Sequence, residues 1–309
     1  MNITILFPVF NEKKNISKLI FEIEKIINQN TRYNFSIFFI DNNSNDGTQE
    51  EIREFCKNKK FIKAIFNKRN FGTLRSTFYG LINSDGDAVI LLPADFQIPL
   101  NVIPNLISKI EGGYEACLLK RKSSKENLIL QAFRKLYYKL INTFSESKIL
   151  EGVTGDGIYS KKAISTLKNN HDPYPLLRGL IIEKSIEFDV LLFDQELRSY
   201  GKSSYSFFDY FQYGVLSFVR HSRKFLRLII LIGFLLGIVS FFIAIAFFVY
   251  KLLNWNDFSV GIAPIIIGVF GLGSFQIFLI GILGEYLITL QDYQKKLPLV
   301  FEKERINFD

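Results

Sequence analysis

The sequence predicts an α/β domain on a mostly parallel sheet, followed by a membrane anchor of two helices. Two observations predict this fold. Residues 1–120 alternate short β-branched and aromatic runs with amphipathic helical patterns, which is typical of consecutive βα units. Near the C-terminus, two stretches of 23 and 27 residues carry no charge, and about 20 apolar residues are enough to cross a membrane.

The βα units define where ligands are expected to bind. The predicted strands are Ile3–Phe7, Ser36–Ile40, Ile62–Phe66 and Ala88–Leu92. The predicted helices are Asn15–Asn28, Gln49–Asn58, Thr73–Asn83 and Leu100–Glu111. Ligands of such sheets bind beyond the carboxyl ends of the strands, so the loop after each strand is a candidate part of the site.

The uncharged stretches are Leu228–Tyr250 and Phe258–Gly284. Buried helices of soluble proteins rarely continue that far without a polar residue. The alternative, that both stretches are buried helices of a soluble protein, is therefore disfavoured. Basic residues flank the outer ends of the pair, at Arg220, Arg223, Lys224, Arg227, Lys295, Lys296, Lys303 and Arg305. The positive-inside rule therefore predicts that both ends of the anchor are cytoplasmic, and the first residues lack the features of a secretory signal.

The expected organisation has four parts. Residues 1–205 form a cytoplasmic domain, 206–227 an interfacial amphipathic helix, 228–291 the two-helix anchor and 292–309 a cytoplasmic tail. Residues 125–145 have an apolar and a basic face, and fit either a packed or an interfacial helix. Small residues in the second span, at Gly268, Gly271 and Gly273, leave room for packing between subunits and so for a homo-oligomer.

The net charge and the cysteines narrow the class of partner. The formal net charge of +8 is partly juxtamembrane, which favours an anionic lipid surface over nucleic acid, for which the sequence has no motif. Cys56 and Cys117 are two isolated thiols, too few for a disulfide framework or a zinc site.

The loops after the second, third and fourth strands carry candidate site residues. In DNNSNDGT, Asp41 could accept hydrogen bonds from a nucleotide, although this composition is also ordinary turn chemistry. In NKRNFG, Arg69 and the amides around Gly72 could hold a phosphate at the start of a helix. In PADFQIP, Asp95 and Gln97 could both face a divalent cation, and their oxygen ligands suit Mg²⁺ or Mn²⁺.

Together with FPVFNE after the first strand, these loops resemble the family 2 glycosyltransferases of the GT-A fold. They are most similar to the polyprenyl-phosphate group, which includes dolichyl-phosphate mannose synthase and bactoprenol glucosyltransferase. The resemblance continues through most of the chain, in KRKSS at 120–124, TGDGIYSKKAI at 154–164, RGL at 178–180, RSYGKSSYSF at 198–207 and GEY at 284–286. It differs at Pro93 and Asn42, where the family usually has acidic residues.

The resemblance implies an inverting hexosyltransferase of the bacterial inner membrane, which moves a sugar from a UDP- or GDP-linked donor to undecaprenyl phosphate at the cytoplasmic face. It implies that the donor is bound by Pro8, Glu12, Asp41, Arg69 and Asp95, and the Mg²⁺ or Mn²⁺ by Asp95 and Gln97. It implies that the acceptor and the phosphates are bound by Arg121, Arg134, Arg198 and Lys202. The implied catalytic set is Asp95, Asp156, Arg198 and Lys202.

Asp156 aligns with the acid that is often assigned as the base in this family. A phosphate monoester is already largely a dianion at neutral pH, so we expect Asp156 to orient the acceptor or the sugar. Transfer to another membrane lipid hydroxyl is an alternative, and it would require Asp156 as a true base. A processive synthase would carry a Q-x-x-R-W motif, yet the only tryptophan is Trp255. Pro93 also leaves open a degenerate transferase that serves as a membrane scaffold.

Overall fold

The computed structural model describes residues 1–122, 151–170, 172–196, 262–294 and 298–308, with isolated positions at 139–143 and 231–253. The chain divides into two compact units. The first comprises Met1–Tyr138, Ser147–Ser204 and Lys296–Asp309, and the second comprises Lys139–Glu146 and Tyr205–Lys295.

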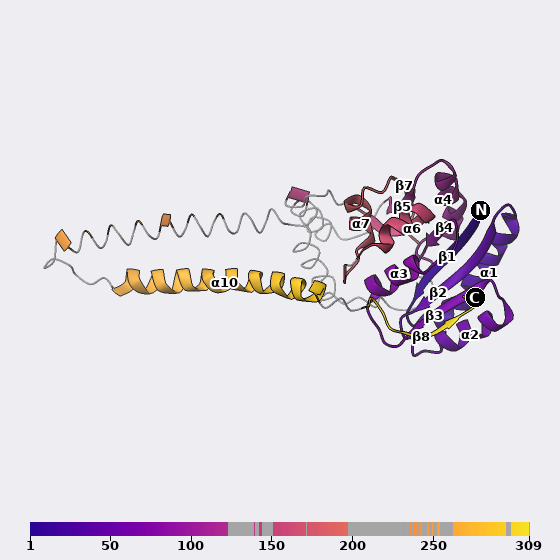
Figure 1. Cartoon of the computed structure of the whole chain (residues 1–309), viewed down its shortest axis with the longest axis horizontal. Helices are drawn as coiled ribbons and strands as arrows, with labels where there is room; N and C mark the ends of the chain where they lie inside the picture. Colours follow the sequence, from indigo (N-terminus) through magenta and orange to yellow (C-terminus); the bar gives the residue numbers. More distant parts are fainter. Residues whose placement is uncertain are drawn as a thin grey trace. The chain divides into compact units, whose positions relative to one another are not determined.

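The first unit is built on an eight-stranded sheet with the order β7-β5-β6-β4-β1-β2-β3-β8 (Figure 1). The strands are β1 Asn2–Val9, β2 Asn34–Asp41, β3 Ile62–Asn67, β4 Ala88–Leu91, β5 Ala116–Arg121, β6 Val153–Ser160, β7 Phe188–Phe193 and β8 Glu302–Ile306. Strand β1 pairs in parallel with β2 and β4, β2 with β3, and β5 with β7. Strands β6 and β8 are antiparallel to their neighbours. The predicted mostly parallel α/β sheet is confirmed.

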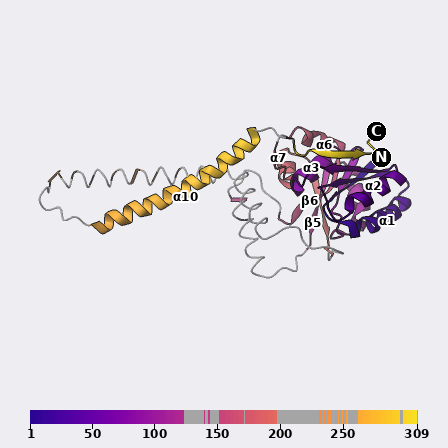
Figure 2. The same ribbon diagram turned by 90° about the horizontal axis from the view of Figure 1, so that it is seen from below.

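Helices cover both faces of this sheet, as Figures 1 and 2 show. They are α1 Lys13–Gln29, α2 Thr48–Asn58, α3 Thr73–Ile82, η1 Leu100–Val102, α4 Ile103–Glu111, α6 Lys161–Lys168 and α7 Leu177–Glu183. The alternating side chains of each strand supply two separate cores. Ile5 and Phe39 pack in the core that includes residues of α1, α2 and α4. Leu6 and Phe38 pack in the core that includes residues of α3, α6 and α7.

The four strands and four helices predicted for residues 1–111 are all present, with ends shifted by a few residues. Strands β5, β6, β7 and β8 were not predicted. The last of these lies in the segment interpreted as a cytoplasmic tail, where Glu302–Ile306 pair antiparallel with β3. The two cysteines are free and buried, and burial raises the pKa of Cys56 to about 12 and that of Cys117 to about 11.

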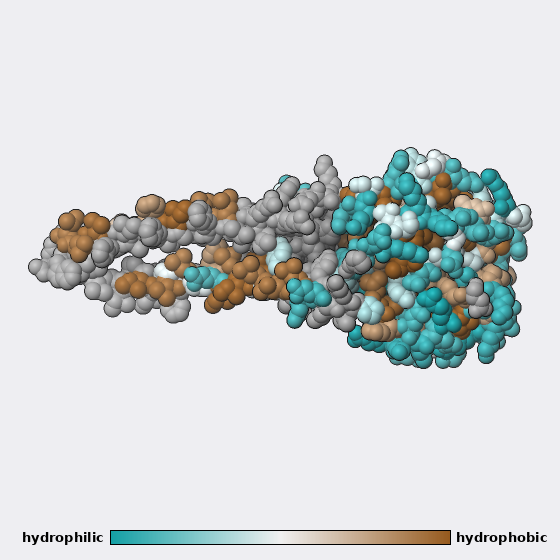
Figure 3. Space-filling model, viewed as in Figure 1, coloured by the Kyte–Doolittle hydropathy of each residue, from teal (hydrophilic) through white to brown (hydrophobic). Residues whose placement is uncertain are grey.

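In the second unit, α10 runs over Ile262–Gln294, and large apolar side chains are exposed along its length. Figure 3 shows these hydrophobic side chains along α10. Within the part of the chain that the structure describes, no helix is long and apolar enough to be a membrane span. The first predicted span, Leu228–Tyr250, lies almost entirely outside the described residues, as do the predicted helices at 125–145 and 206–227. The second, Phe258–Gly284, overlaps α10.

Candidate active site

The candidate site lies at the carboxyl ends of the central parallel strands, where the sequence predicted it. Val9, at the end of β1, lies opposite Asp41, at the end of β2. The backbone N–H of Asn42 donates to the carbonyl of Val9 at 3.0 Å. Pro8 is half-buried within β1 and lies opposite Ile40. The first two predicted loops therefore leave the sheet side by side.

These two loops are tied together by hydrogen bonds. The N–H of Asn11 donates to Ser44 Oγ at 2.8 Å, and Asn11 Oδ1 accepts from the N–H of Asn45 at 2.9 Å. The N–H of Glu12 donates to Thr48 Oγ1 at 3.0 Å. Asn11 has a φ of 56° and Asn43 a φ of 66°, a left-handed backbone that asparagine tolerates better than most residues. This tolerance explains why asparagine fits these two turns.

The carboxylate of Asp41 holds the second loop from within. It is fully buried and accepts from the N–H of Ser44 at 3.0 Å and from Gln49 Nε2 at 2.7 Å. Burial raises its pKa, and the hydrogen bonds from Ser44 and Gln49 act in the opposite direction. The predicted contact of Asp41 with the donor stays a prediction.

Asn42 connects the second loop to the third. Its Oδ1 accepts from the N–H of Phe71 at 3.0 Å and from Asn67 Nδ2 at 3.2 Å, and its Nδ2 donates to Asn70 Oδ1 at 2.7 Å. Asn70 Oδ1 also accepts from the N–H of Gly72 at 2.8 Å. Arg69 is exposed on this loop, with its guanidinium 4.7 Å from the centre of the Phe71 ring. An exposed, stacked guanidinium is available to a phosphate.

The fourth loop brings together Asp95 and Gln97, the two predicted metal ligands. Asp95 is buried, and its Oδ1 and Oδ2 accept from the backbone N–H and from Nε2 of Gln97 at 3.1 and 2.6 Å. Gln195 donates to Gln97 Oε1, and the N–H of Glu196 donates to the Gln97 carbonyl at 3.0 Å. The loop is therefore also attached to the segment after β7.

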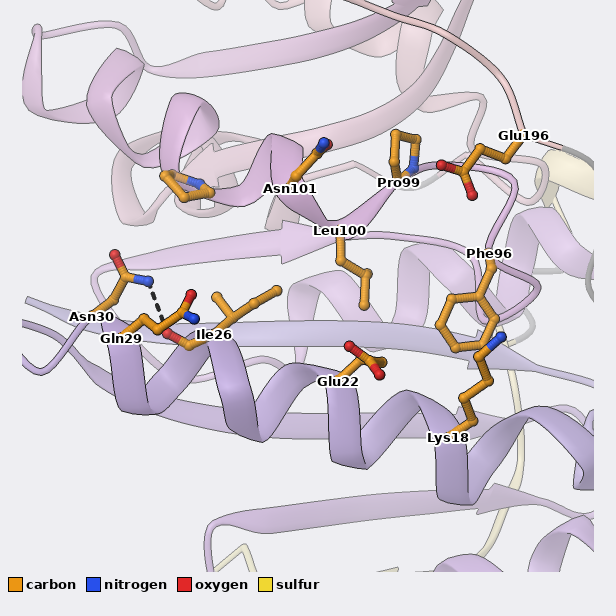
Figure 4. Close-up of a pocket in the computed structure, with 11 residues that line it drawn as sticks. Lys18, Glu22, Ile26, Gln29, Asn30, Phe96, Pro99, Leu100, Asn101 and Glu196 are labelled. Carbon is orange, nitrogen blue, oxygen red and sulfur yellow. Dashed lines mark hydrogen bonds between the residues drawn. The ribbon is translucent and has the colours of Figure 1, made fainter.

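Phe96 lies between these two residues, with a φ of 62°. A left-handed backbone is costly for a bulky residue and is concentrated at functional sites. Lys18 Nζ lies 4.7 Å from the centre of the Phe96 ring. Figure 4 shows the two side chains beside a groove of about 510 Å³ that Glu22, Leu100 and Glu196 also line.

The donor chemistry of the fourth loop fits a hard divalent cation. Among the described residues, no three His, Cys, Asp or Glu side chains form a cluster that could hold a metal. Asp95 and Gln97 offer one carboxylate and one amide oxygen, and Mg²⁺ is commonly held by one or two carboxylates together with substrate phosphates. The pair therefore suits a metal that is completed by a diphosphate.

Asp156 lies in β6, between Gly155 and Gly157, in the segment that resembles the family's TGD motif. Burial raises the pKa of its carboxyl, a hydrogen bond with Thr154 and the charge of Arg121 lower it, and the charge of Asp95 raises it again. Asp156, Arg121 and Asp95 thus share one electrostatic environment, although they come from three different segments of the chain. Such a shift on an acid is typical of functional sites.

The described part of the chain joins the loops after β1, β2 and β3 by hydrogen bonds, and it places the charges of Asp95 and Arg121 near Asp156. Arg134, Arg198 and Lys202 lie outside the described residues. Sequence reasoning missed the roles of Asn42 and Gln195 and a contact from the C-terminal segment, where Phe301 packs against Phe71. Asn42 and Asn70 are hydrogen-bonded to each other but belong to no pattern in the sequence that would pair them. Gln195 and Phe301 are far from the loops in the sequence and contact them only in the folded protein.

Comparison of the sequence with known proteins identifies the family. The model of glycosyl transferase family 2 matches residues 4–167. The chain is 31% identical to the putative glycosyltransferase CsbB of Bacillus subtilis (strain 168) over 303 residues, covering 98% of this chain and 91% of that protein.

Two further relatives are similar along nearly their whole length. The bactoprenol glucosyl transferase of Shigella phage SfX is 27% identical, with 99% of this chain and 100% of that protein covered. The undecaprenyl-phosphate 4-deoxy-4-formamido-L-arabinose transferase of Proteus mirabilis (strain HI4320) is 24% identical, with 97% and 92% covered.

Proposed function

The chain belongs to glycosyl transferase family 2 and is a glycosyltransferase, and from this premise we propose that it transfers a sugar from a nucleotide donor to a polyprenyl phosphate. The reaction takes place at the cytoplasmic face of the membrane and inverts the configuration at the anomeric carbon. The donor is a sugar linked to UDP or GDP, and the acceptor is of the undecaprenyl phosphate type.

One observation carries the proposal. Leu91, the last residue of β4, lies opposite Gly157 on β6, so the metal loop with Asp95 leaves the sheet beside the TGD segment with Asp156. The charges of Asp95 and Arg121 both act on the Asp156 carboxyl. A donor diphosphate at Asp95 would therefore have its sugar near Asp156. The names of two full-length relatives, which refer to bactoprenol and to undecaprenyl phosphate, support the choice of acceptor.

The reaction has three physical requirements, which are a neutralised leaving diphosphate, a charged nucleophile and alignment of the two. Asp95 and Gln97 would hold Mg²⁺ or Mn²⁺, which supplies positive charge to the diphosphate when bound. Arg69 is exposed on the third loop for a further phosphate contact. Arg121, Arg134, Arg198 and Lys202 would bind the acceptor phosphate and the departing phosphates, while Pro8, Glu12 and Asp41 would contact or support the nucleoside.

Asp156 orients the acceptor or the sugar in this mechanism. The acceptor phosphate, with a second pKa of about 6, is already mostly dianionic at neutral pH and needs no base. Gly157, the neighbour of Asp156, pairs with Leu91 on β4 and with Leu118 on β5, which holds this part of β6 in the sheet.

The membrane supplies the acceptor, because a polyprenyl chain stays in the bilayer. The uncharged stretches Leu228–Tyr250 and Phe258–Gly284, and the apolar side chains exposed along α10, support a two-span anchor. The basic residues of 206–227 would hold the catalytic unit against anionic headgroups.

The proposal is tested with purified full-length protein in detergent or vesicles. We expect it to form a lipid-linked sugar when undecaprenyl phosphate is offered with one member of a panel of UDP- and GDP-sugars and Mn²⁺, detected by mass spectrometry. Asp95→Asn is expected to lose product, whereas Asp85→Asn, which removes an exposed carboxylate, is expected to retain it.

Two parallel arms distinguish the alternatives. Diacylglycerol in place of undecaprenyl phosphate tests transfer to a lipid hydroxyl, and product there alone would replace the acceptor class. Absence of lipid-linked product with every acceptor and donor would contradict the proposal.

A further inference from the structure

We infer that Phe301, just before the C-terminal strand β8, is a positioning residue for the third loop of the donor site. This inference rests on the proposed function, because it assigns the loop of residues 67–72 to donor binding. It gives the C-terminal segment a role in positioning the donor-binding loop of the catalytic unit.

Strand β8 is firmly attached to the sheet. It pairs antiparallel with β3, with Ile306 opposite Ala64 and Glu304 opposite Phe66. Arg53 Nε donates to Glu304 at 2.8 Å, and Asn307 Nδ2 donates to the carbonyls of Cys56 and Ile62 at 2.8 Å each. The ring of Phe308 packs edge-on against Phe38, with centroids 5.0 Å apart.

The strand reaches the third loop through Phe301. The pairing of β3 with β8 becomes irregular between Phe66 and Asn67, and beyond that point the N–H of Lys68 donates to the Phe301 carbonyl at 2.8 Å. The rings of Phe301 and Phe71 lie 6.1 Å apart, centre to centre. Arg69 in turn stacks on Phe71 at 4.7 Å. Phe301, Phe71 and Arg69 therefore form one continuous chain of side-chain contacts, a tilted ring pair followed by a cation–π contact, that ends at the predicted phosphate contact.

The helix that follows the loop is held by the same strand. Tyr79 of α3 donates from its hydroxyl to Glu302 Oε1 at 2.8 Å, and Arg305 donates to Asn83 Oδ1 at 3.2 Å. The loop of residues 68–72 lies between β3 and α3, and β8 contacts both of these elements. The position of the loop thus depends on a segment more than 200 residues away in the sequence.

Phe301 contributes more to the loop than to the core. Its side chain is 48% exposed, whereas the neighbouring Val300 is 4% exposed. Truncation of a half-exposed ring removes little buried area, so the fold should survive its loss. The loop would lose its aromatic support, because Lys68, Arg69 and Asn70 are themselves exposed.

The test uses full-length protein with Phe301→Ala, Phe301→Tyr and a matched control, Phe21→Ala. Phe21 is an exposed phenylalanine of α1, 57% accessible, stacked under Lys25 at 4.2 Å. Two quantities are measured, namely the affinity for UDP and GDP with Mn²⁺ and the hydrogen exchange of a peptide covering residues 68–73. We expect Phe301→Ala to weaken nucleotide binding about two- to tenfold, the strength of one aromatic pair, and to speed exchange in that peptide.

Phe301→Tyr keeps the ring and should restore both quantities, and Phe21→Ala should change neither. Equal nucleotide affinity and equal exchange in Phe301→Ala and the wild type would overturn the inference, as would equal losses in Phe301→Ala and Phe21→Ala. If Phe301→Ala fails to fold, Phe301→Leu replaces it, with the same outcomes. If the wild type binds no nucleotide, the proposed function fails, and unchanged exchange at residues 68–73 would still overturn the positioning role.

Discussion

The side-chain oxygen of Asn42 accepts a hydrogen bond from the backbone N–H of Phe71 at 3.0 Å, which joins the second strand-end loop to the third. The family that this chain resembles usually has an acidic residue at this position, and the sequence analysis identified Asn42 as a departure from it. The structure gives the residue a different significance. Its contacts to Phe71 and Asn67 use an acceptor oxygen, which asparagine and aspartate both possess.

We therefore predict that Asn42→Asp retains nucleotide affinity within a few-fold, while Asn42→Ala loses about tenfold or more. The aspartate keeps the acceptor for Phe71 and Asn67, and it loses only the donor to Asn70 Oδ1, which still accepts from the N–H of Gly72. The alanine leaves the N–H of Phe71 without its acceptor and leaves the Asn67 amide with Ser76 Oγ alone, at a cost of about 1–3 kcal/mol. Titration calorimetry with UDP and GDP measures both variants, and equal affinities for Asn42→Ala and wild type would contradict the linking role.

Asp156 gives a prediction about stability and pH. Burial raises the pKa of its carboxyl in the folded protein above the unfolded value. The folded state therefore binds more protons, so the stabilising contribution is complete below about pH 4 and is lost as the pH rises through the folded pKa. Asp156→Asn removes this titration, and we expect its melting temperature to exceed that of wild type at pH 7.5.

The same difference should vanish by about pH 4, because both side chains are then neutral. Melting curves across this range, recorded in one detergent, provide the measurement. A variant less stable than wild type at pH 7.5 would show that the charged carboxylate is favourable in the fold. In turnover assays, total loss of activity with intact nucleotide binding would count against a positioning role and in favour of a base.

Local patterns explain which parts of the fold and the site were predictable. Ile3–Phe7 and Ser36–Ile40 are apolar runs with a helix after each, so their strands and the loops beyond them follow from the sequence. Asp95 and Gln97 are two residues apart, so their meeting needed no tertiary information.

Other features depend on contacts that no local pattern records. Glu302–Ile306 begins with four charged residues in succession, a pattern that predicts no strand, and it becomes a strand only because β3 offers an open edge. Arg121 and Asp156 were identified only from the family resemblance, because the strands that carry them, β5 and β6, pair although they are well separated in the sequence. The attachment of Gln195 to Gln97 joins residues 98 positions apart.

The single carboxylate of the fourth loop leads to a prediction about metal binding. In Gln97→Glu, a second carboxylate replaces the amide that donates to Asp95 Oδ2 at 2.6 Å. Without metal, the two acids repel each other and the protein should melt at a lower temperature than wild type. With Mn²⁺, we expect about tenfold tighter metal binding than in wild type, because a further negative charge faces the cation.

Melting temperature against Mn²⁺ concentration measures this change. Gln97→Ala serves as the opposite control and should bind Mn²⁺ more weakly than wild type. Identical Mn²⁺ responses in Gln97→Glu, Gln97→Ala and wild type would place the metal away from this loop.

Gly157 carries the last prediction, because it sets the position of the strand that holds Asp156. Its φ is +148°, and a Cβ atom there would lie 2.0 Å from the carbonyl oxygen of Cys117 on β5. Backbone atoms form this obstacle, so β5 and β6 would have to separate. We predict that Gly157→Ala loses about 3 kcal/mol or more of unfolding free energy together with glycosyl transfer.

Gly113→Ala is the matched control. Its φ is +99°, yet a Cβ there would meet nothing within 4 Å, so only the backbone strain of about 1–2 kcal/mol applies. Urea denaturation of both variants separates the two costs. Comparable losses would mean that the β5–β6 pair can open to admit a methyl group, and the position of Asp156 would then not depend on the close contact at Gly157.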